Sequence, residues 1–439
     1  MPQIAIPDRE TKSFIKPSRG EVYGNVWATK NIDFGSNRGK IRLSERLYRL
    51  FDDGDDADME VPVKFIRSNA DGTDRWWVLA QAGANSVSDG LLFKSTDTDP
   101  TGTWAQDAIV SSPTDCVDDM EIFGQVTTDR LVVARDTDLA MLENGAWTAS
   151  WWDTTLAQAA LTATNPHPLH QFLNLLILTD GNVIHTIDDS LVVVASRLTL
   201  PKEYQIMWIE DDGNRVYFGT RHIRGGEALV FPWNGTDETY DTPIPVKDSI
   251  SLAGVASSAG VMHTLNGKGQ LLGYNGQDFE EVAALPVADS KVRWQTSATL
   301  VRAQKVHANG MALIDGRISI LLMGQVDAGY LIENMNSGIW EYDEKVGLYH
   351  KYSISQYDGT TDNEWGVSYL IAAGALAETS QFKGRFLAGA EIYVDGETTK
   401  LEGIFTSAVA GTVTQRGYSI TPQISASDVG AFWKRLNLA

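Results

Sequence analysis

The densest group of potential metal ligands in the sequence is an acidic run near the N-terminus. Residues Asp52 to Asp58 place five carboxylates in seven positions, and oxygen ligands at that density can hold Ca²⁺. A helix–loop–helix calcium loop also needs a Glu at its twelfth position, where this chain has Val63. We therefore predict a solvated loop without a metal, and calcium binding is the alternative.

Two histidines and the single cysteine are the other residues that could do chemistry. His167 and His170 would share a face on a helix and could bind zinc there, but Pro166 and Pro168 disfavour a helix. No Cys or Glu lies close by in the sequence to complete a zinc site, so we expect no metal. Cys116 can form no internal disulfide, and a lone cysteine is more typical of a small core residue than of a nucleophile.

One turn motif and a set of arginines bear on catalysis. The segment from Ser95 to Trp104 resembles the Asp-box hairpin of sialidase-type propellers, which is a structural element in that family. A sialidase would add three substrate-binding arginines, a Tyr–Glu nucleophile pair and an acid. The arginines of this chain instead recur at the starts of expected strands, which indicates a structural role such as an ion pair at the rim. They are Arg75, Arg130, Arg215, Arg317 and Arg385. We predict no catalytic residue and no cofactor.

Two adjacent tryptophans are candidate ligand-binding residues. If Trp151 and Trp152 are exposed, their rings could stack on sugars. The alternative is that both rings pack in the core between repeats.

Tight turns that precede an aromatic residue recur along the chain. They carry Asn-Gly, Asp-Gly or related pairs, which accept the positive φ angles of a β-hairpin turn. One residue from each turn gives positions 97, 144, 188, 234, 275, 343 and 395. Each turn is preceded by a polar opener and a short apolar strand. A spacing of about 40–50 residues with about four strands in each repeat is typical of a β-propeller.

The predicted fold class is therefore all-β. We predict a β-propeller of six or seven four-stranded blades over residues 61–410, with an N-terminal arm and short strands over 1–60 and C-terminal closing or docking strands over 411–439. The segment from Leu285 to Gln304 is expected to be an insertion between blades, or alternatively a degenerate extra blade. The segment from Phe432 to Leu438 is expected to pair with the arm and to close the ring.

The charge of the chain is strongly acidic and unevenly distributed. Lys and Arg number 36 against 57 Asp and Glu, a net charge of −21, yet residues 1–50 carry ten basic and five acidic residues. The acidic excess disfavours nucleic-acid binding over the whole surface. We predict that the basic arm lies on an acidic neighbour, and the alternative is a solvated tail. Candidate interaction residues in the arm are Lys12, Lys16, Arg19, Lys30, Arg38, Lys40 and Arg42.

Neither a signal-peptide pattern nor a stretch of 18 apolar residues occurs in the sequence. We expect synthesis in a cytoplasm and no membrane insertion.

The two ends of the chain resemble β-propeller structural proteins of tailed bacteriophages. The resemblance covers Gly24 to Phe34, Gly39 to Ser44, Tyr418 to Pro422 and Phe432 to Leu436, together with the general blade pattern. It implies a non-enzymatic virion protein of the neck or tail, such as a nozzle-like ring or a tail-tip component, made in the cytoplasm of a bacterial host. Candidate docking residues at the C-terminus are Phe432, Trp433, Lys434 and Arg435.

The resemblance also implies the partners. They would be copies of the same chain in a ring of six, together with other neck or tail proteins, and DNA would pass through such a ring without specific binding. Two other functions remain open from the sequence, namely a glycan-binding or receptor-binding propeller and a glycan hydrolase of sialidase-like architecture.

Overall fold

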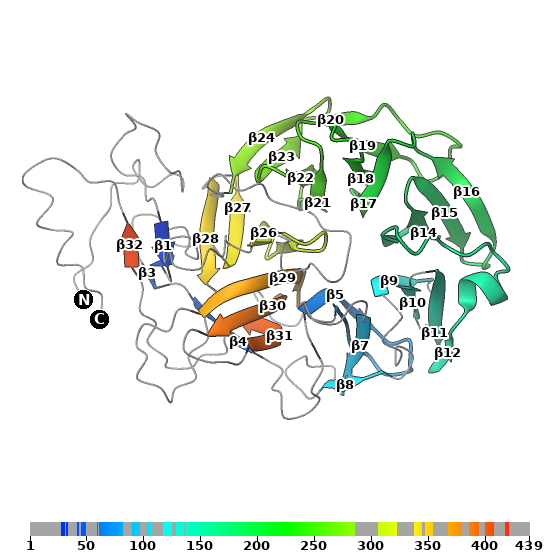
Figure 1. Cartoon of the computed structure of the whole chain (residues 1–439), viewed down its shortest axis with the longest axis horizontal. Coiled ribbons are helices and arrows are strands. Elements are labelled where there is room, and N and C mark those ends of the chain that lie inside the picture. Colours follow the sequence, from blue (N-terminus) through cyan, green and yellow to red (C-terminus); the bar gives the residue numbers. More distant parts are fainter. Residues whose placement is uncertain are drawn as a thin grey trace, which may run out of the picture.

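The protein is an all-β ring of seven four-stranded antiparallel blades (Figure 1). The computed structural model describes residues 28–30, 32–33, 42–43, 45–49, 59, 61–81, 90–96, 104–107, 117–124, 129–135, 137–285, 306–322, 338–344, 347–353, 368–379, 386–394, 400–407 and 418–420. Among these residues there is a single helical turn, η2 (Trp151–Thr155). No helix in the described ranges has the length and hydropathy needed to cross a membrane.

The first four blades follow one another without interruption in strand order. Blade one consists of β5 (Val61–Ser68), β6 (Arg75–Gln81), β7 (Gly90–Ser95) and β8 (Trp104–Gln106). Blade two consists of β9 (Val117–Phe123), β10 (Arg130–Arg135), β11 (Asp138–Glu143) and β12 (Ala146–Thr148). Blade three consists of β13 (Leu169–Phe172), β14 (Leu175–Asp180), β15 (Val183–Asp188) and β16 (Val193–Thr199). Blade four consists of β17 (Tyr204–Asp211), β18 (Val216–His222), β19 (Ala228–Trp233) and β20 (Ile244–Val246).

The last three blades complete the ring. Blade five consists of β21 (Ser251–Ala256), β22 (Met262–Asn266), β23 (Gln270–Tyr274) and β24 (Phe279–Ala284). Blade six consists of β25 (Met311–Ile314), β26 (Arg317–Leu322), β27 (Gly338–Asp343) and β28 (Gly347–Ser353). Blade seven combines β29 (Ser368–Glu378), β30 (Phe386–Val394) and β31 (Lys400–Ser407) with a strand from the N-terminal region, β4 (Glu45–Arg49).

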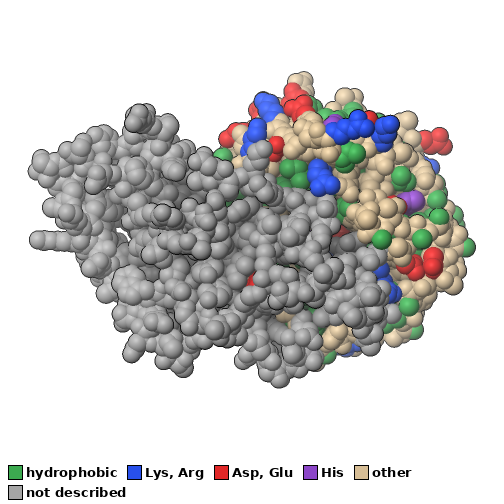
Figure 2. Space-filling view, in the orientation of Figure 1, with side chains coloured by type: hydrophobic (Ala, Val, Ile, Leu, Met, Phe, Trp, Pro, Cys, Tyr) green, Lys and Arg blue, Asp and Glu red, His purple; other side chains and the backbone are tan. Residues whose placement is uncertain are grey.

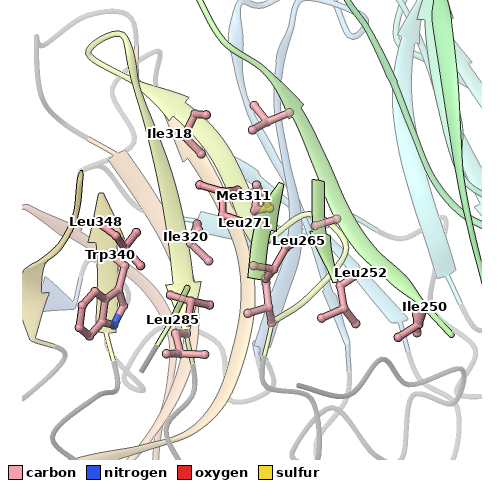
Figure 3. Packing of buried hydrophobic residues seen from close by; sticks show 14 residues of the cluster. Ile250, Leu252, Leu265, Leu271, Leu285, Met311, Ile318, Ile320, Trp340 and Leu348 are labelled. Atoms are coloured by element: carbon pink, nitrogen blue, oxygen red, sulfur yellow. The ribbon is translucent and has the colours of Figure 1, made fainter. Parts of the chain in front are cut away.

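The first strand of each blade contacts the first strand of the next blade, and β29 of blade seven contacts β5 of blade one. These strands therefore form the innermost circle of the ring. Seven buried hydrophobic clusters lie between the blades, one at each of the seven interfaces. Figure 3 shows the cluster between blades five and six, in which Leu265 and Leu271 face Ile318 and Ile320. The continuous apolar strands of the sequence are explained by this arrangement, because each blade is covered on both faces.

The ring is closed by β4, which supplies the outer strand of blade seven. Leu47, Tyr48 and Arg49 pair antiparallel with Ser407, Thr406 and Phe405 of β31. The sequence analysis placed the closing strand at residues 432–438, which lie outside the described residues. It also assigned residues 45–49 to the arm rather than to a blade.

Two further strand pairs lie outside the blades. β1 (Ala28–Lys30) pairs with β32 (Tyr418–Ile420), and β2 (Ile32–Asp33) pairs with β3 (Arg42–Leu43). Figure 1 shows the β1–β32 pair beside the ring, on the same side as β28. The N-terminal and C-terminal regions of the chain therefore meet in a small sheet of their own.

The recurrent turns of the sequence correspond to hairpins of the blades. Five of the seven turn residues directly follow, or end, the third strand of their blade, and Asn144 with Gly145 takes φ angles of 52° and 78° between β11 and β12. Position 97 falls between β7 and β8 in the sequence and lies outside the described residues. The seventh, at 395, lies between the second and third strands of blade seven, because the outer strand of that blade comes from the N-terminal region. Seven turn signals therefore correspond to seven blades, and the prediction of a propeller is confirmed.

The interpretation of Trp151 and Trp152 as exposed sugar-binding residues is wrong. Their exposed fractions are 0% and 1%, and both belong to the hydrophobic cluster between blades two and three. The turn η2 directs them inward, and the indole Nε1 of Trp152 donates a 2.7 Å hydrogen bond to the carbonyl of Ala159. The alternative interpretation, core packing, is the one that the structure confirms.

Candidate functional site at the centre of the ring

Charged side chains gather on the inner strands of four consecutive blades. Most residues of these strands are buried and apolar, so charged side chains at the centre of the ring are exceptions to the pattern. They include Lys64 on β5, Asp119 and Glu121 on β9, His170 on β13, and Glu210 and Asp211 on β17. Arg67 of β5 pairs with Asp74 instead. The inner strands β21 and β25 of blades five and six carry no charged residue, and β29 of blade seven carries one, Glu378, at its end.

Lys64 joins blade one to blade two. Its Nζ lies 3.2 Å from Oδ1 of Asp119 and 3.7 Å from Oε2 of Glu121. Burial opposes the positive charge, but the two carboxylates outweigh it and raise the pKa of Lys64. The other carboxylate oxygen of Asp119 accepts a 2.9 Å hydrogen bond from the backbone amide of Leu169 in blade three. Asp119 therefore connects three successive blades.

His170 and Asp211 form a second pair, between blades three and four. His170 Nε2 lies 2.7 Å from Oδ2 of Asp211. Burial favours the neutral imidazole, but the hydrogen bond to Asp211 and the nearby charges of Glu210 and Glu121 outweigh it and raise the pKa of His170. Burial alone would raise the pKa of Asp211, but the hydrogen bond and the charge of His170 outweigh it and lower that pKa. Both effects favour a charged pair.

Glu210 differs from its neighbours because no described residue donates a hydrogen bond or an ion pair to its carboxyl group. The side chain of Glu210 is partly exposed to solvent. Burial raises the pKa of Glu210 to about 7, and the charges of Asp211 and Glu121 raise it further than His170 and Lys64 lower it. Burial also raises the pKa of Glu121.

The segment that leads into blade six approaches this group from the other side of the ring. His307 is buried, and burial together with the charge of Lys64 lowers the pKa of His307 to about 4. The side-chain amide of Asn309 donates a 2.9 Å hydrogen bond to the carbonyl of Val63. The imidazole of His307 is therefore neutral at physiological pH, and it adds no charge to the centre.

The ion pairs at the centre of the ring engage three of its carboxyl groups. Glycoside hydrolysis uses two carboxyl groups, one as an acid and one as a nucleophile or base. Here Lys64 already holds Glu121 and His170 holds Asp211, so Glu210 is left as a single carboxyl group without a partner among the described residues. Within the same residues, no group of three or more His, Cys, Asp or Glu is placed to hold a metal ion.

Four of the five recurrent arginines lie within the described residues and form ion pairs, in agreement with their predicted structural role. Arg75 contacts Asp71 at 3.1 Å, and Arg130 contacts Glu143 at 2.7 Å. The remaining pairs of this kind are Arg215 with Asp241 at 3.4 Å and Arg317 with Asp343 at 3.5 Å. Arg385 lies outside the described residues.

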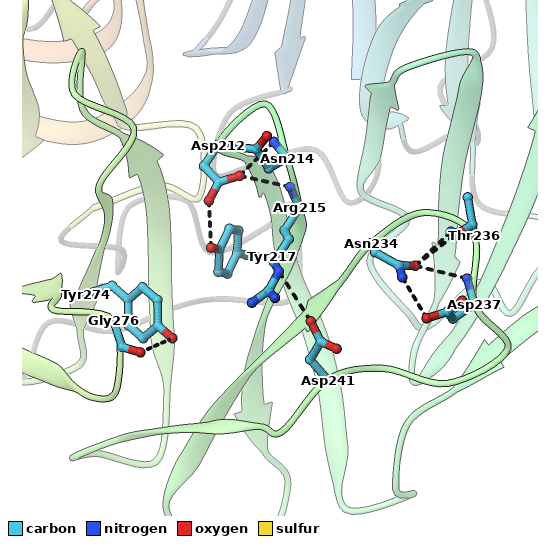
Figure 4. Close-up of polar contacts among 10 residues, drawn as sticks. All are labelled: Asp212, Asn214, Arg215, Tyr217, Asn234, Thr236, Asp237, Asp241, Tyr274 and Gly276. Atoms are coloured by element: carbon cyan, nitrogen blue, oxygen red, sulfur yellow. Dashed lines mark hydrogen bonds and ion pairs between the residues drawn. The ribbon is translucent and has the colours of Figure 1, made fainter.

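Polar side chains also stabilise the turns of the rim, as Figure 4 shows for blades four and five. The carboxylate of Asp212 accepts hydrogen bonds from the backbone amides of Asn214 and Arg215 and from the hydroxyl of Tyr217. Asn234 accepts hydrogen bonds from the amides of Thr236 and Asp237 in the same way. These contacts satisfy the backbone of tight turns, and they account for the abundance of Asn and Asp there.

The other candidates from the sequence that the structure describes do not gather into a site. His167 lies against Asp180, at 3.6 Å, whereas His170 pairs with Asp211, so the two histidines hold different partners. Lys30 and Arg42 belong to β1 and β3. The remaining basic arm residues, the C-terminal docking residues, Cys116 and the acidic run all lie outside the described residues. They are Lys12, Lys16, Arg19, Arg38, Lys40, Phe432, Trp433, Lys434, Arg435 and 52–58.

The described surface that faces the viewer in Figure 2 carries Lys and Arg side chains interspersed with Asp and Glu. Charges of both signs on this face contrast with the excess of carboxylates at the centre of the ring.

The sequence analysis missed the central residues. The available signal was a charged residue inside an otherwise apolar strand, as for Lys64 in Val61–Ser68.

Comparisons with known proteins show likeness in structure only. No family model and no curated protein matches the chain. Solved structures that resemble it include a catalytically inactive virginiamycin B lyase from Staphylococcus aureus with quinupristin, at 10% identity and a TM-score of 0.49, with 83% of this chain and 99% of that chain covered. The C-terminal WD40 domain of Sif2 has 11% identity and a TM-score of 0.44, with 84% and 100% covered. The extracellular domain of a putative hybrid two component system from B. thetaiotaomicron has 13% identity and a TM-score of 0.43, with 82% and 47% covered.

The architecture described above does not depend on these likenesses. It follows from the strand pairing and the seven interblade clusters of this chain.

Proposed function

We propose that the protein is a non-enzymatic structural component of a tailed-bacteriophage virion, located in the neck or tail. It would act as a rigid ring that holds copies of itself and neighbouring virion proteins through contacts made by its chain ends. In a nozzle-like ring of six copies, the net charge of −21 would let DNA pass without adhering, because like charges repel. Synthesis would take place in the cytoplasm of the bacterial host.

The observation that carries this proposal is the β1–β32 pair. It is a two-stranded sheet outside the blades, and an isolated two-stranded sheet is only marginally stable in water. Each of its strands has one edge that is unpaired within the described residues, and such edges are sites at which another chain can add a strand. A neighbouring subunit that added a strand here would complete the sheet.

The charge distribution gives a second line of support. Residues 1–50 carry a net charge of +5 and the remainder of the chain −26. A basic end beside an acidic ring favours contact between one copy and the next, because potentials of opposite sign steer association. The sequence resemblance at both ends points to the same class of protein.

The two residues that suggested glycan or receptor binding are not available at the surface. Trp151 and Trp152 are buried between two blades, and a side chain that packs in the core is not available to stack on a sugar. We therefore advance no second function.

Two experiments test the proposal. Mass spectrometry of purified particles of a phage whose genome encodes this chain should find it as a stoichiometric virion protein, and its absence from intact particles would overturn the proposal. Light scattering of the purified full chain should give a mass of roughly 290 kDa if six copies of the 48.1 kDa chain form a closed ring. A monomer at all concentrations, both alone and with its virion neighbours, would contradict the ring.

A further inference from the structure

Five Asn-Gly pairs occur in the chain, and all five lie within the described residues. Such a pair can modify itself, because the backbone nitrogen of the glycine can attack the side-chain carbonyl carbon of the asparagine before it. The attack needs a glycine amide that is free to react and a side-chain NH₂ group that is free to leave, so hydrogen bonds to either group oppose it. The five asparagines are Asn144, Asn234, Asn266, Asn275 and Asn309.

Three of the pairs hold the attacking amide in a backbone hydrogen bond. The bonds run from Gly145 to the carbonyl of Ala70, from Gly267 to that of Ile250 and from Gly310 to that of His307, at 3.0, 3.2 and 2.9 Å. In two of these pairs the side-chain amide is held as well, since Nδ2 of Asn266 donates to Gln270 at 2.9 Å and Nδ2 of Asn309 donates to the carbonyl of Val63 at 2.9 Å. The folded ring therefore protects these three pairs.

Asn234 and Asn275 form a closer comparison, because each directly follows the third strand of its blade, β19 or β23. In both, Oδ1 accepts hydrogen bonds from the backbone amides two and three residues further along, at 3.0 Å for Asn234 and 2.9 Å for Asn275. Nδ2 of Asn234, however, also donates a 2.7 Å hydrogen bond to Asp237 (Figure 4). Gly235 is buried, and a Cβ atom there would lie 2.8 Å from the ring of Phe172. The leaving group and the glycine of this pair are both held in place.

Asn275 lacks both restraints. It is exposed, and neither its Nδ2 nor the backbone amide of Gly276 has a hydrogen-bond partner among the described residues. Gly276 takes a φ angle of 98°, and no atom lies within 4 Å of the place where a Cβ would stand. The hydroxyl of Tyr274 binds the carbonyl of Gly276 at 3.0 Å (Figure 4), which leaves the amide of that glycine unengaged.

We propose that Asn275 is a site of spontaneous modification, at which asparagine converts to aspartate and isoaspartate in the folded protein. After it loses its proton to solvent, the nitrogen of Gly276 attacks Cγ of Asn275. The N–Cγ bond forms, the Cγ–Nδ2 bond breaks, and the amide leaves as ammonia after taking up a proton from water. Water then opens the five-membered imide at either of its carbonyl carbons, so the reaction needs no oxidant or reductant.

The turn itself assists this reaction. The backbone amides of Gln277 and Asp278 donate to Oδ1 of Asn275, where negative charge develops as the nitrogen adds. Both products add a carboxylate to the turn between β23 and β24, and isoaspartate also inserts a methylene group into the backbone of that turn. The inference concerns this turn alone and is independent of where in a particle or a cell the protein works.

The test is peptide mapping by mass spectrometry of the full-length chain after incubation at mildly alkaline pH, with isoaspartate detected by enzymatic methylation. In the folded protein we expect Asn275 to convert at least about tenfold faster than Asn234, because a hydrogen bond holds the leaving group only at Asn234. In urea the folded contacts are lost, and the five Asn-Gly pairs should convert at rates within about threefold of one another. Similar rates at Asn275 and Asn234 in the folded protein would overturn the proposal, as would conversion of Asn275 only in urea.

Ion-exchange chromatography of two variants gives an independent readout, because each conversion adds one negative charge. Asn275→Gln should abolish most of the acidic species that accumulates in the unmodified protein, since a glutamine at this position would have to close a larger and slower-forming ring. The matched control is Asn214→Gln, at an exposed turn of blade four where arginine instead of glycine follows. It should leave the acidic species unchanged. Persistence of that species in Asn275→Gln, or its equal loss in both variants, would overturn the assignment of Asn275.

Discussion

Asn309 and Val63 are joined by a 2.9 Å hydrogen bond from the side-chain amide to the backbone carbonyl, although 246 residues separate them in sequence. The bond links the segment before blade six to the inner strand of blade one and passes the inner edge of blade seven. Next to it, the carbonyl of Pro62 lies so close to Gly374 and Gly389 that a Cβ atom at either glycine would be 1.9 Å away. The junction between the first and last blades therefore depends on close backbone contact.

Substitution of Gly389 by Ala should destabilise the ring at this junction. A Cβ atom 1.9 Å from the Pro62 carbonyl forces the two blades apart, and overpacking of this kind costs about 1–3 kcal/mol. The control is Gly273→Ala on β23, where the nearest atom is Cγ1 of Val282 at 3.1 Å, on a partly exposed side chain that can move. Denaturant unfolding of both variants measures the difference. Equal stability of the two variants would mean that the junction is not tightly packed.

Removal of residues 1–50 should open blade seven, because it deletes β4. The edge of β31 at Phe405, Thr406 and Ser407 would then have no partner, and an open edge promotes association between chains. We expect a midpoint of thermal unfolding lower by about 5 °C or more, and concentration-dependent association by light scattering. Removal of residues 1–27 is the matched control, since it keeps β1 to β4, and it should shift the midpoint by less than about 1 °C. Identical behaviour of the two truncations would show that β4 is dispensable.

Asp180 offers a test of a polar network on blade three. Its carboxylate accepts hydrogen bonds from Asn165 at 2.6 Å and from the hydroxyl of Thr162 at 2.9 Å, and it lies 3.6 Å from His167. Burial opposes ionisation, but these contacts outweigh it and lower the pKa of Asp180. The stabilisation is therefore fully present above about pH 4, the usual carboxyl pKa, and it is lost as the pH falls below that value.

Replacement of Asp180 by Asn should accordingly cost about 1–3 kcal/mol at neutral pH. The difference from the unmodified chain should shrink below about pH 4, where Asp180 of the unfolded chain begins to take up a proton while the folded carboxylate stays ionised. Urea unfolding at several pH values measures it. Asp189→Asn, at an exposed position in the next turn, should change stability by less than about 0.5 kcal/mol. A loss that stays constant with pH would show that shape rather than charge matters at position 180.

Much of the fold could be predicted from the sequence because its signals are local. A hairpin turn such as Asn144-Gly145 needs only adjacent residues that tolerate positive φ angles, and the repeat of such turns gave the propeller. The predicted number of blades stayed at six or seven because no hairpin joins the third strand of blade seven to its outer strand. That outer strand is β4. That pairing joins residues near position 47 to residues near 406, and no local pattern marks it.

The candidate site was not predictable in the same way. Lys64, Asp119, His170 and Asp211 lie on four blades, and only the closed ring brings them together. Trp151 and Trp152 illustrate a different problem. The sequence pattern of aromatic residues after a turn is the same whether their side chains face solvent or the core. Their burial is decided by the π-helical turn and by the hydrophobic face of blade three.

Glu210 should make the stability of the ring depend on pH in the direction opposite to Asp180. Its folded-state pKa of about 7 lies above the usual carboxyl value of 4.5, so the folded protein holds a proton that the unfolded chain releases between these values. Its contribution is therefore fully present below about pH 4.5 and is lost as the pH rises through 7.

Replacement of Glu210 by Gln removes this penalty, because the amide is neutral at every pH. The variant should be more stable than the unmodified chain at pH 8, by on the order of 2 kcal/mol, and should match it near pH 5. Denaturant unfolding across this range measures the crossover, with Glu280→Gln as the control that should show none. If Glu210→Gln is instead less stable at pH 8, the carboxylate has a stabilising partner in the folded ring, and the raised pKa of Glu210 would be refuted.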